Sequence, residues 1–564
     1  VDLAICSPPL LPYFSLTVDN DLYNSDHFPL ILTDSRHNPI NPFRPPKYVL
    51  NAANWQKFTS LANINSDIIK SSTIEEALNH IVNIIIEAAD NSIPKTSGTR
   101  RKQNKPWWDA DCQHAYKRQR KAWDAFRRYP TTENFINFKK SKAVSRRTQR
   151  RSRRVSWRKF VSSITSTISS RQLWNKVKKA SGISPPNAVS VLIHNGNTIS
   201  SLKDIANTIA STLAHTSSNQ NYPLPILNFK KKAEKQKLRF HSQANQPYNC
   251  DLTFLELQSC LSKVHDSSPG PDSISYAMIK HLSTESQENL LYLYNRIWKE
   301  HYFPTFWQQA TIIPLLKPGK DPTNPSNYRP IALTCCLCKL LEKMINCRLV
   351  YYLETNNFIH PSQSGFRRGR STVDNLLALE TGIRLAFLER KHFVAVFFDI
   401  EKAYDKTWRY GILKDMYDIG LRGNLPIFIQ NFLRLRKFRV KVESELSDFF
   451  IQEEGVPQGS VLSVTLFMLK INNILKQLPT SVKSFLYVDD LYISCTGMHM
   501  NFIQRQLQIA INSITQWSNA NGFTISTSKT TAVHFCRKRN LHFDPELKLN
   551  GEMIPFQTEI RFLA

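Results

Sequence analysis

The hydrophobic pattern of the chain becomes regular only after about residue 250. From residue 251 to the end, apolar stretches of helix length alternate with Pro/Gly turns and with short apolar runs of strand length. The unbroken apolar run at 393–398 predicts a buried strand, and a helical stretch is expected after it. The segment SFLYVDDLYIS (484–494) has two short apolar arms around an Asp-Asp pair, which predicts a tight β-hairpin with the acids at its tip.

The part of the chain before residue 251 is less regular. The pattern of residues 1–35 predicts short strands and turns, and the segment SDHFPL lies near their end. Residues 36–99 begin with several prolines and are expected to form a linker. Residues 181–250 are rich in Ser, Asn and Pro and contain the run KKKAEKQKLR, which predicts a flexible connector to a domain formed by residues 251–564.

The composition indicates a polyanionic partner. At about 150 residues per domain, 564 residues correspond to roughly three to four domains, and a hydrophobic fraction of 41% allows packed cores. Lys and Arg number 74 against 45 Asp and Glu, which gives a net charge of +29 and a pI near 9.7. Nucleic acid is the partner expected for such an excess of positive charge.

Several classes of protein are disfavoured. No apolar run reaches 18 residues, which argues against a membrane-spanning helix, and the first residues do not resemble a secretory signal. The ten cysteines are scattered, so a reduced, intracellular protein is expected. The single CxxC pair, Cys335 and Cys338, has helical apolar flanks and no second pair at metal spacing, which predicts buried core thiols rather than a zinc site. The absence of an initiator Met suggests a fragment.

The strongest local charge lies in residues 100–159. They hold 21 Lys and Arg against four acids, so their net charge is 21 − 4 = +17. Proline and glycine almost vanish, which predicts one or two long basic helices within residues 100–180. A solvated helical face with aromatic anchors is one interpretation. We favour non-specific binding of phosphate backbones, because such a charge is hard to solvate without a partner. The interleaved aromatic residues are Trp107, Trp108, Trp123, Phe126, Phe138 and Trp157.

Two predicted strand ends carry carboxylates. Asp399 follows the run 393–398, and Asp489 and Asp490 lie at the predicted hairpin tip. Each is ordinary alone, because aspartate is a common turn residue. Together they supply enough oxygen ligands for two divalent cations about 3.5–4 Å apart, the arrangement used for in-line phosphoryl transfer. Hard oxygen ligands favour Mg²⁺ over Zn²⁺.

The segment EEGVPQGSVLS lies between these two places. Pro457 favours a turn, Gly459 allows close backbone approach, and Gln458 offers an amide beside it. It is either a simple loop or a surface against which a nucleotide and a template base lie.

Six ordered blocks resemble reverse transcriptases of non-LTR retrotransposons, with jockey-like LINE elements of arthropods the nearest. The resemblance covers roughly residues 250–564. It implies an α+β right-hand polymerase whose palm of antiparallel strands and helices follows the fingers, and Mg²⁺-dependent synthesis of DNA from dNTPs on an RNA template, for target-primed reverse transcription. The blocks are NYRPIAL (327–333), QSGFRRGRST (363–372), FFDIEKAYD (397–405), GVPQGSVLS (455–463), YVDD (487–490) and GFTISTSKT (522–530).

The resemblance implies a role for each matching residue. Asp399, Asp489 and Asp490 would bind two Mg²⁺ ions as the catalytic carboxylates. Tyr404 would exclude a ribose 2′-OH, at a position where most relatives have Phe, and the commoner form of YVDD has Ala in place of Val488.

Further residues of the blocks would bind the nucleotide and the template. Gln458 and Gly459 would contact the incoming nucleotide, Arg329 would hold its triphosphate, and Lys529 would protonate the pyrophosphate leaving group. A surface ion pair is the alternative for Lys529. Template contacts are implied for Arg367, Arg368 and Arg370, with a basic loop tip as the alternative.

Two other segments depart from the family pattern. SPGPDSI (268–274) resembles the extension before the fingers but has Ser273 where Gly is usual, and Val464 stands where relatives usually have Pro. The final EIRFLA resembles the start of the block that leads into the thumb, so a truncated thumb is expected.

The N-terminus resembles the last part of an apurinic/apyrimidinic-like endonuclease domain, which such elements carry before their polymerase. SDHFPL matches its terminal signature. His27 would act at the scissile phosphate or activate water, Asp26 would be a ligand or orienter, and Asp2 would pair with the histidine. The metal-binding Glu and earlier strands of that domain are not present, so this chain is not expected to nick DNA.

The partners implied are template RNA, primer or target DNA, dNTPs and a ribonucleoprotein with element RNA, without a membrane. The family's replication cycle implies both cytoplasm and nucleus. The alternative function is an inactive or domesticated nucleic-acid-binding protein derived from such an element. A telomerase or intron maturase fits poorly, because neither carries an SDHFPL-type remnant.

Overall fold

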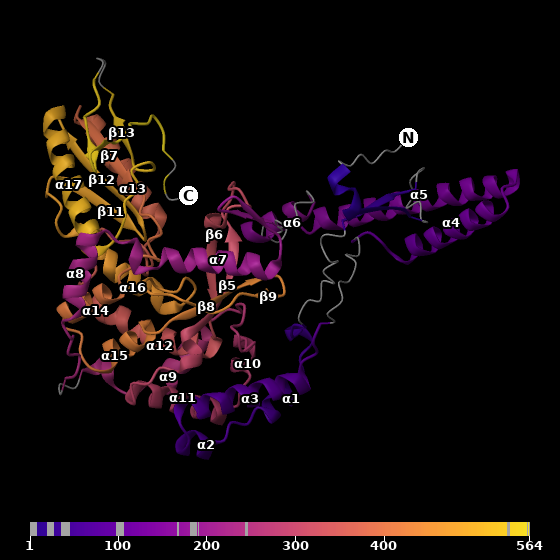
Figure 1. Cartoon of the computed structure of the whole chain (residues 1–564), viewed down its shortest axis with the longest axis horizontal. Helices are drawn as coiled ribbons and strands as arrows, with labels where there is room; N and C mark the ends of the chain where they lie inside the picture. The colour runs from indigo at the N-terminus through magenta and orange to yellow at the C-terminus, as the bar shows by residue number, and fades with distance from the viewer. Residues whose placement is uncertain are drawn as a thin grey trace. The chain divides into compact units, whose positions relative to one another are not determined.

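The computed structural model describes residues 8–19, 28–34, 46–96, 106–165, 168–180, 189, 191–242, 246–537, 542–560 and 562 (Figure 1). These residues divide into two compact units, one within 1–47 and 96–188 and the other within 48–95 and 189–564. Asp2, Asp26 and His27 lie outside the described residues. None of the described helices has the length and apolar character needed to cross a membrane.

The first unit is built around an antiparallel pair of long helices. Its elements are the hairpin β1 (Phe14–Val18) and β2 (Leu30–Asp34), and the helices α4 (Ala110–Arg128), α5 (Thr132–Ser162) and α6 (Ser170–Ala180). Asp109 caps α4 by accepting a hydrogen bond from the Cys112 amide, and Ser152 of α5 donates to the same carboxylate at 2.7 Å. The prediction of one or two long basic helices is confirmed.

Three helices occupy the stretch that was expected to be a linker. They are α1 (Trp55–Leu61), α2 (Ser66–Ser71) and α3 (Ile74–Ser92). Leu78, Ile81 and Ile85 form a fully buried face of α3 at helical spacing. The linker prediction is therefore wrong for residues 55–92, because this apolar face is packed into the main core of the second unit.

The expected flexible connector is also structured. Residues 191–242 contain the hairpin β3 (Leu192–His194) and β4 (Asn197–Ile199) and the helices α7 (Leu202–Thr216) and α8 (Leu224–Glu234). Ile205 and Ile209 of α7 are fully buried in a core shared with β8 (Lys437–Val442). Lys230 of α8 forms a buried ion pair with Glu454 at 2.6 Å. The core packing of α7 and the ion pair of α8 attach this segment to the second unit, and its polar composition gave no sign of either contact.

A mixed sheet has the strand order β10-β8-β5-β6, with β9 paired to β8. Its strands are β5 (Gln309–Leu316), β6 (Tyr328–Leu333), β8, β9 (Glu445–Leu446) and β10 (Phe450–Ile451). The pair β5–β6 is antiparallel and the pair β5–β8 is parallel. This sheet places the segment NYRPIAL on the edge strand β6.

An antiparallel sheet has the order β11-β12-β7-β13. Its strands are β7 (His392–Phe398), β11 (Val482–Tyr487), β12 (Asp490–Gly497) and β13 (Thr531–Phe535). Every residue of β7 is buried, because alternate side chains enter two different cores, one of them packed against α13 (Thr372–Leu388). Helix α17 (Met500–Asn521) contributes to the other core and contacts β12 (Figure 1). The predicted buried strand is confirmed.

Helices complete the second unit and give it an α+β character, as expected. Helix α12 (Cys336–Thr355) begins within the CxxC pair, and Cys335 and Cys338 are buried in the main core, which confirms the prediction of core thiols. Ser273 has a φ of 61°, a left-handed conformation in which glycine avoids the Cβ clash, and this accounts for the glycine that is usual there. The remaining helices are α9 (Phe254–Ser262), α10 (Tyr276–Lys280), α11 (Thr284–Lys299), α12 (Cys336–Thr355), α14 (Arg409–Asp418), α15 (Asn424–Leu433) and α16 (Val461–Ile471).

Candidate active site and nucleic-acid surface

The three predicted carboxylates meet at one end of the antiparallel sheet. Asp399 follows β7, while Asp490 begins β12, and the register pairs Phe398 with Leu491. Asp399 and Asp490 are therefore the next facing positions, where Cα atoms of antiparallel strands lie about 4.5–5.5 Å apart. Asp489 lies in the two-residue turn between β11 and β12. The predicted hairpin and its acidic tip are confirmed, whereas a run of turns, not a helix, follows Asp399 up to α14.

The turn that carries the acids has an unusual backbone. Val488 has a φ of 63°, which is uncommon for any residue with a Cβ and costly for a β-branched one. Such conformations persist where surrounding contacts determine them and are frequent at functional sites. Alanine, the commoner residue of the family block, would not have the branched side chain.

The loop at 362–365 supports this turn from one side. The Ser364 amide donates to the Leu486 carbonyl at 2.9 Å, and the Leu486 amide donates to the Ser362 carbonyl at 3.0 Å. A Cβ on Gly365 would lie 2.5 Å from the Val488 nitrogen, so only glycine fits here. The segment QSGF therefore acts as a backing for YVDD.

The loop GVPQGS is held between two other blocks. The Ala332 amide of β6 donates to the Gln458 carbonyl at 2.7 Å, and a Cβ on Gly459 would lie 2.4 Å from the Ala332 oxygen. The Gln458 amide donates to Asp405 at 3.0 Å. Glu342 of α12 accepts hydrogen bonds from Ser460 and from the amide of Val461 at the start of α16. These bonds place Gln458 beside the segment that carries Asp399.

Tyr404 lies beside the carboxylates on this segment. Its ring stacks on Phe467 of α16 with centroids 4.4 Å apart. Burial raises the pKa of Tyr404, and the negative charge of Asp489 raises it further, so the phenol stays protonated at neutral pH. The packed ring therefore lies close enough to Asp489 to sense its charge.

The three acids are close enough for their negative charges to act on one another. Burial, and after it the charges of Asp489 and Asp399, raise the pKa of Asp490 to about 6. Burial also raises the pKa of Asp489, with an additional contribution from Asp399 and an opposing one from Arg329. Carboxylates that repel one another in this way are suited to share divalent cations, which remove the repulsion. These oxygen ligands therefore fit Mg²⁺.

Lys529 contacts the site directly. Its Nζ donates to Asp399 Oδ2 at 2.9 Å, although its side chain remains 66% exposed. The Ser526 amide donates to the Asp399 carbonyl, and the Glu401 amide donates to the Thr524 carbonyl, so the segment GFTISTSKT is paired with the end of β7. The structure thus shows Lys529 in an ion pair with Asp399, and its role toward the leaving group stays a prediction.

The sequence interpretation missed three charged residues of the site. The Lys317 pKa is lowered, first by burial and then by the nearby charges of Lys402 and Lys529. Arg329 adds to the same positive field and is exposed on β6. The negative charge of Asp405 opposes this positive field at Lys317, and burial raises the pKa of Asp405 itself to about 6. Lys402 and Asp405 both occur within FFDIEKAYD, so inspection of the charges inside that block could have found them.

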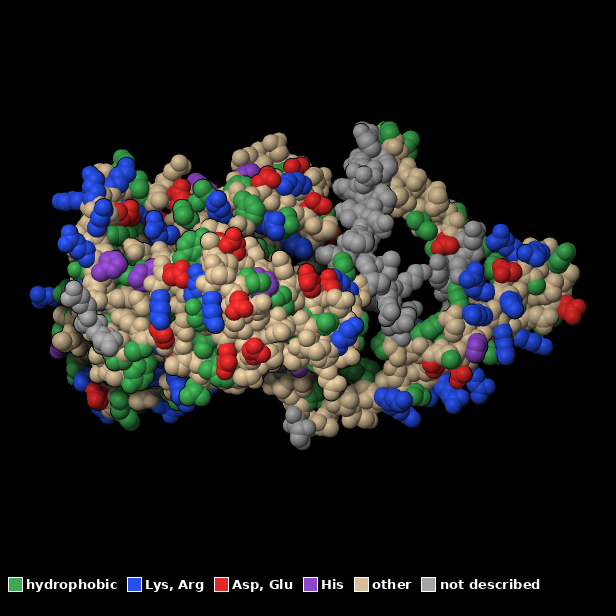
Figure 2. Space-filling view, turned by 90° about the horizontal axis from the view of Figure 1, so that it is seen from below, with side chains coloured by type: hydrophobic (Ala, Val, Ile, Leu, Met, Phe, Trp, Pro, Cys, Tyr) green, Lys and Arg blue, Asp and Glu red, His purple; other side chains and the backbone are tan. Residues whose placement is uncertain are grey.

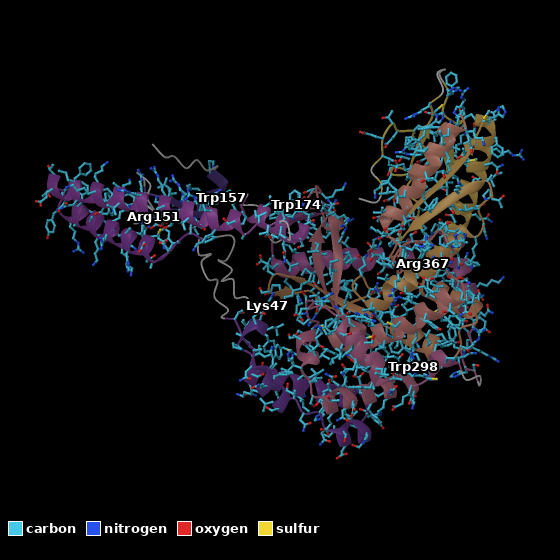
Figure 3. All side chains as sticks on the ribbon, turned by 180° about the vertical axis from the view of Figure 1, so that it is seen from behind. Lys47, Arg151, Trp157, Trp174, Trp298 and Arg367 are labelled. Carbon is cyan, nitrogen blue, oxygen red and sulfur yellow. The ribbon has the colours of Figure 1, made fainter. Side chains whose placement is uncertain are left out.

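The three arginines of the QSGFRRGRST segment differ in their surroundings. Arg367 makes two hydrogen bonds to Glu354, at 2.8 and 2.6 Å, and two more to the carbonyls of His360 and Gln363 (Figure 3). Its guanidinium thus stabilises the loop, which does not fit the template contact implied by the resemblance. Arg368 and Arg370 are exposed.

The helices α4 and α5 form a basic surface. Aromatic residues hold the two helices together, with Trp123 and Phe138 at 4.9 Å, and Arg153 lies 4.3 Å over the Trp107 ring. Trp157 is different, since 57% of it is exposed (Figure 3). Figure 2 shows Lys and Arg side chains gathered along these helices. The exposed arginines of α5 include Arg146, Arg147, Arg150, Arg151, Arg153 and Arg154.

Residues 315–564 match a family model described as reverse transcriptase (RNA-dependent DNA polymerase). A probable RNA-directed DNA polymerase from transposon BS of Drosophila melanogaster is 28% identical over 53% of this chain and 33% of its own length. The RNA-directed DNA polymerase from mobile element jockey of Drosophila funebris is 29% identical over 56% of this chain and 35% of its own length. A Pol polyprotein from the type-1 retrotransposable element R2 of Popillia japonica is 31% identical over 41% and 30% of the two chains.

The chain spans about a third of the length of the first two of these relatives. The region matched by the family model contains all six sequence blocks and the three carboxylates that the sheet brings together. The family model and the relatives support an enzyme with an RNA-directed DNA polymerase domain similar to those of non-LTR retrotransposons.

Proposed function

We propose that this chain is a Mg²⁺-dependent RNA-directed DNA polymerase of a non-LTR retrotransposon, and that it acts in target-primed reverse transcription. One observation carries the proposal: β7 and the β11–β12 turn bring Asp399, Asp489 and Asp490 to one end of a sheet, where burial and then the charge of Asp399 raise the pKa of Asp489 and Asp490. In this proposal the antiparallel sheet is the palm, and the region of β5 and β6 belongs to the fingers.

The carboxylates would bind two Mg²⁺ ions, which supply activation of the primer 3′-hydroxyl and charge neutralisation at the leaving pyrophosphate. The cationic side chains around them would orient the triphosphate, whose oxygens suit Lys and the forked guanidinium of Arg329. Lys317, Lys402 and Lys529 contribute to this positive field.

Tyr404 and the GVPQGS loop would select the nucleotide. The ring of Tyr404, fixed by its stacking on Phe467, would exclude a 2′-hydroxyl by contact. Gln458 and Gly459 would lie along the nucleotide and the template base, because their loop is bonded to β6 and to Asp405. Arg368 and Arg370 are the remaining candidates for template contacts.

The basic helices α4 and α5 would hold RNA or target DNA through phosphates. Their exposed arginines carry this proposal, and no base-specific contact is part of it. Template RNA, primer DNA and dNTPs are the substrates proposed, with element RNA as the ribonucleoprotein partner and action in both cytoplasm and nucleus. We also infer an endonuclease-like remnant in residues 1–35, on the SDHFPL block alone.

Primer extension on a poly(rA)/oligo(dT) template tests the polymerase. Wild-type chain with Mg²⁺ should incorporate dTTP, and Asp489→Asn should abolish incorporation with an unchanged circular dichroism spectrum. Asp448→Asn removes an exposed acid outside the site and should leave the activity intact. Equal background in wild type and Asp489→Asn would overturn the proposal and leave a nucleic-acid-binding protein.

A further inference from the structure

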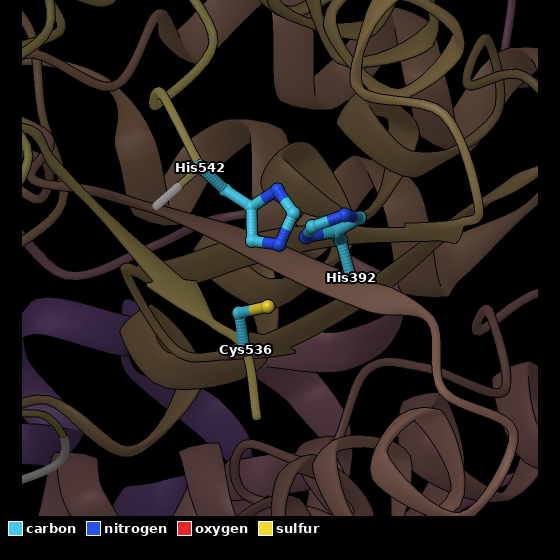
Figure 4. A group of neighbouring side chains, drawn as sticks. All are labelled: His392, Cys536 and His542. Atoms are coloured by element: carbon cyan, nitrogen blue, oxygen red, sulfur yellow. The ribbon is translucent and has the colours of Figure 1, made fainter. Parts of the chain in front are cut away.

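A group of three potential metal ligands lies at the other end of the antiparallel sheet. His392 is the first residue of β7, Cys536 follows β13 directly, and His542 lies on the segment after it (Figure 4). One ring nitrogen of each histidine and the cysteine sulfur all lie within 4.8 Å of one another. The seven steps along the strand from His392 to Asp399, at about 3.3 Å each, separate this group from the carboxylates by roughly 23 Å.

A hydrogen-bonded chain behind His392 sets its tautomer. His534 Nδ1 lies 2.8 Å from Asp544 Oδ1, and His534 Nε2 lies 3.0 Å from His392 Nδ1. Because a carboxylate only accepts, a neutral His534 donates from Nδ1 and accepts at Nε2, and His392 then donates from Nδ1. Nε2 of His392 then carries the lone pair that a metal needs. Ligating histidines generally donate their other N–H to a partner of this kind.

His542 provides the second, independent observation. Its Nε2 is buried and has no hydrogen-bond partner among the described residues. A buried polar nitrogen left without a partner is costly, and a bound cation would satisfy it. The ring stands nearly perpendicular to that of His392, at 79° with centroids 4.7 Å apart, and Figure 4 shows the Cys536 sulfur directed toward the two rings.

The donor set selects the metal. One thiolate and two imidazoles suit Zn²⁺ and similar borderline or soft ions, not Mg²⁺. With bonds of about 2.0–2.3 Å in a tetrahedron, ligand atoms lie about 3.3–3.8 Å apart, so small side-chain rotations bring these three into place. Three protein ligands leave a fourth position for water.

We propose that His392, Cys536 and His542 form a Zn²⁺ site that ties the ends of β7 and β13 to the segment leading into β14 (Lys548–Leu549) and β15 (Glu552–Met553). The role of the site is to stabilise this edge of the domain, and the proposal does not rest on the polymerase function. Binding releases the thiol proton of Cys536 to solvent, and no redox step is involved.

The test uses the full chain, stripped with a chelator and then titrated with Zn²⁺ or Co²⁺. One Zn²⁺ per chain is expected by mass spectrometry, together with a thiolate-to-Co²⁺ charge-transfer band. Cys536→Ser should remove the band, and His542→Ala should weaken Zn²⁺ binding at least tenfold. The matched controls His499→Ala and Cys347→Ser change exposed residues elsewhere and should bind as wild type.

Thermal unfolding covers the case in which a variant folds poorly. Zn²⁺ should raise the unfolding temperature of the wild type and both controls but not that of Cys536→Ser, because a ligand stabilises only the state it binds. The polymerase variant Asp489→Asn should keep the shift, so the two proposals fail separately. Absence of Zn²⁺ binding by the wild type, or equal binding by Cys536→Ser and His542→Ala, would overturn the site.

Discussion

Lys529 Nζ lies 2.9 Å from Asp399 Oδ2, so the lysine proposed as a general acid forms an ion pair with a carboxylate that is proposed to bind metal. The pair is well exposed, so its contribution to stability is about 0.2–1 kcal/mol. Its importance is instead one of position. Occupation of Asp399 by a metal would release the ammonium group toward the leaving group of the reaction.

We expect Lys529→Met to reduce the single-turnover rate of nucleotide incorporation by about 10²–10⁴-fold, the usual size of general acid catalysis. The unfolding temperature should hardly change. Lys483→Met removes another exposed lysine, on β11, and serves as the control. An unaltered incorporation rate would reduce Lys529 to a surface ion pair.

Asp490 makes the free protein and the metal-bound protein respond oppositely to pH. Burial and the charges of Asp489 and Asp399 raise its pKa to about 6 in the folded chain. A raised carboxyl pKa means that the folded chain holds this proton more tightly than the unfolded chain, whose Asp pKa is about 3.9. The metal-free protein should therefore lose stability as pH rises from about 4 to 6, whereas Mg²⁺ affinity should rise over the same window.

The measurement is thermal unfolding between pH 4 and 7, with chelator and with Mg²⁺, for wild type and Asp490→Asn. The difference between the two proteins isolates this carboxyl from all others. In chelator, the substitution should stabilise the protein increasingly as pH rises. If the unfolding temperatures of wild type and Asp490→Asn changed in parallel with pH, the raised pKa of Asp490 would be contradicted.

Gly365 should control activity through the YVDD turn. A Cβ at this position would lie 2.5 Å from the Val488 nitrogen, so Gly365→Ala must displace either the loop or the turn. Overpacking of this kind costs about 1–3 kcal/mol, and misplacement of a reacting group by about 1 Å can cost on the order of 10²-fold in rate. We expect primer extension to fall far more than stability.

The control for that experiment is Gly551→Ala. Gly551 has a φ of 87°, and a Cβ at this position would meet no atom of the described residues within 4 Å, so alanine there introduces backbone strain without a clash. Its primer extension should stay near wild type. A similar loss in both variants would show that Gly365 acts only through global stability.

Substitutions of the neighbouring residues Arg367 and Arg368 should have different effects, one on stability and the other on template binding. Arg367→Gln removes two bonds to Glu354 and should cost about 1.5–3 kcal/mol in the free energy of unfolding. Arg368→Gln changes an exposed side chain and should weaken binding to a primer–template without affecting stability. Chemical denaturation and fluorescence anisotropy measure the two effects. Equal stability losses in the two variants would contradict a structural role for Arg367 and a template-binding role for Arg368.

The sequence predicts the parts of the site that local pattern controls. Burial of β7 in two cores required the unbroken run 393–398, and the short arms around Asp489 and Asp490 formed the hairpin. The helices α1–α3 escaped prediction because distant partners stabilise them, as when the Ser286 hydroxyl bonds both the Ala62 carbonyl and the Ile64 amide.

Long-range assembly also hid other features. The group of His392, Cys536 and His542 joins residues more than 140 positions apart, so no local motif announces it. The structural role of Arg367 likewise depends on Glu354 of α12, which a basic loop sequence does not reveal. Charge inside the family blocks was the one unused local signal, through Lys402 and Asp405.

The basic helices should bind nucleic acid mainly by releasing counterions. Replacing six of the exposed arginines of α5, at 146, 147, 150, 151, 153 and 154, with Gln should flatten the plot of log affinity against log salt on duplex DNA by about 0.9 per lost phosphate contact. The control replaces the exposed lysines at 231, 232, 235 and 237, which belong to the other unit. Circular dichroism checks that the helices remain. Long-range charge changes the slope in both variants, so only a larger change in slope per removed charge in the arginine variant supports contact at α5. An unchanged slope in the arginine variant would leave α5 a solvated helix.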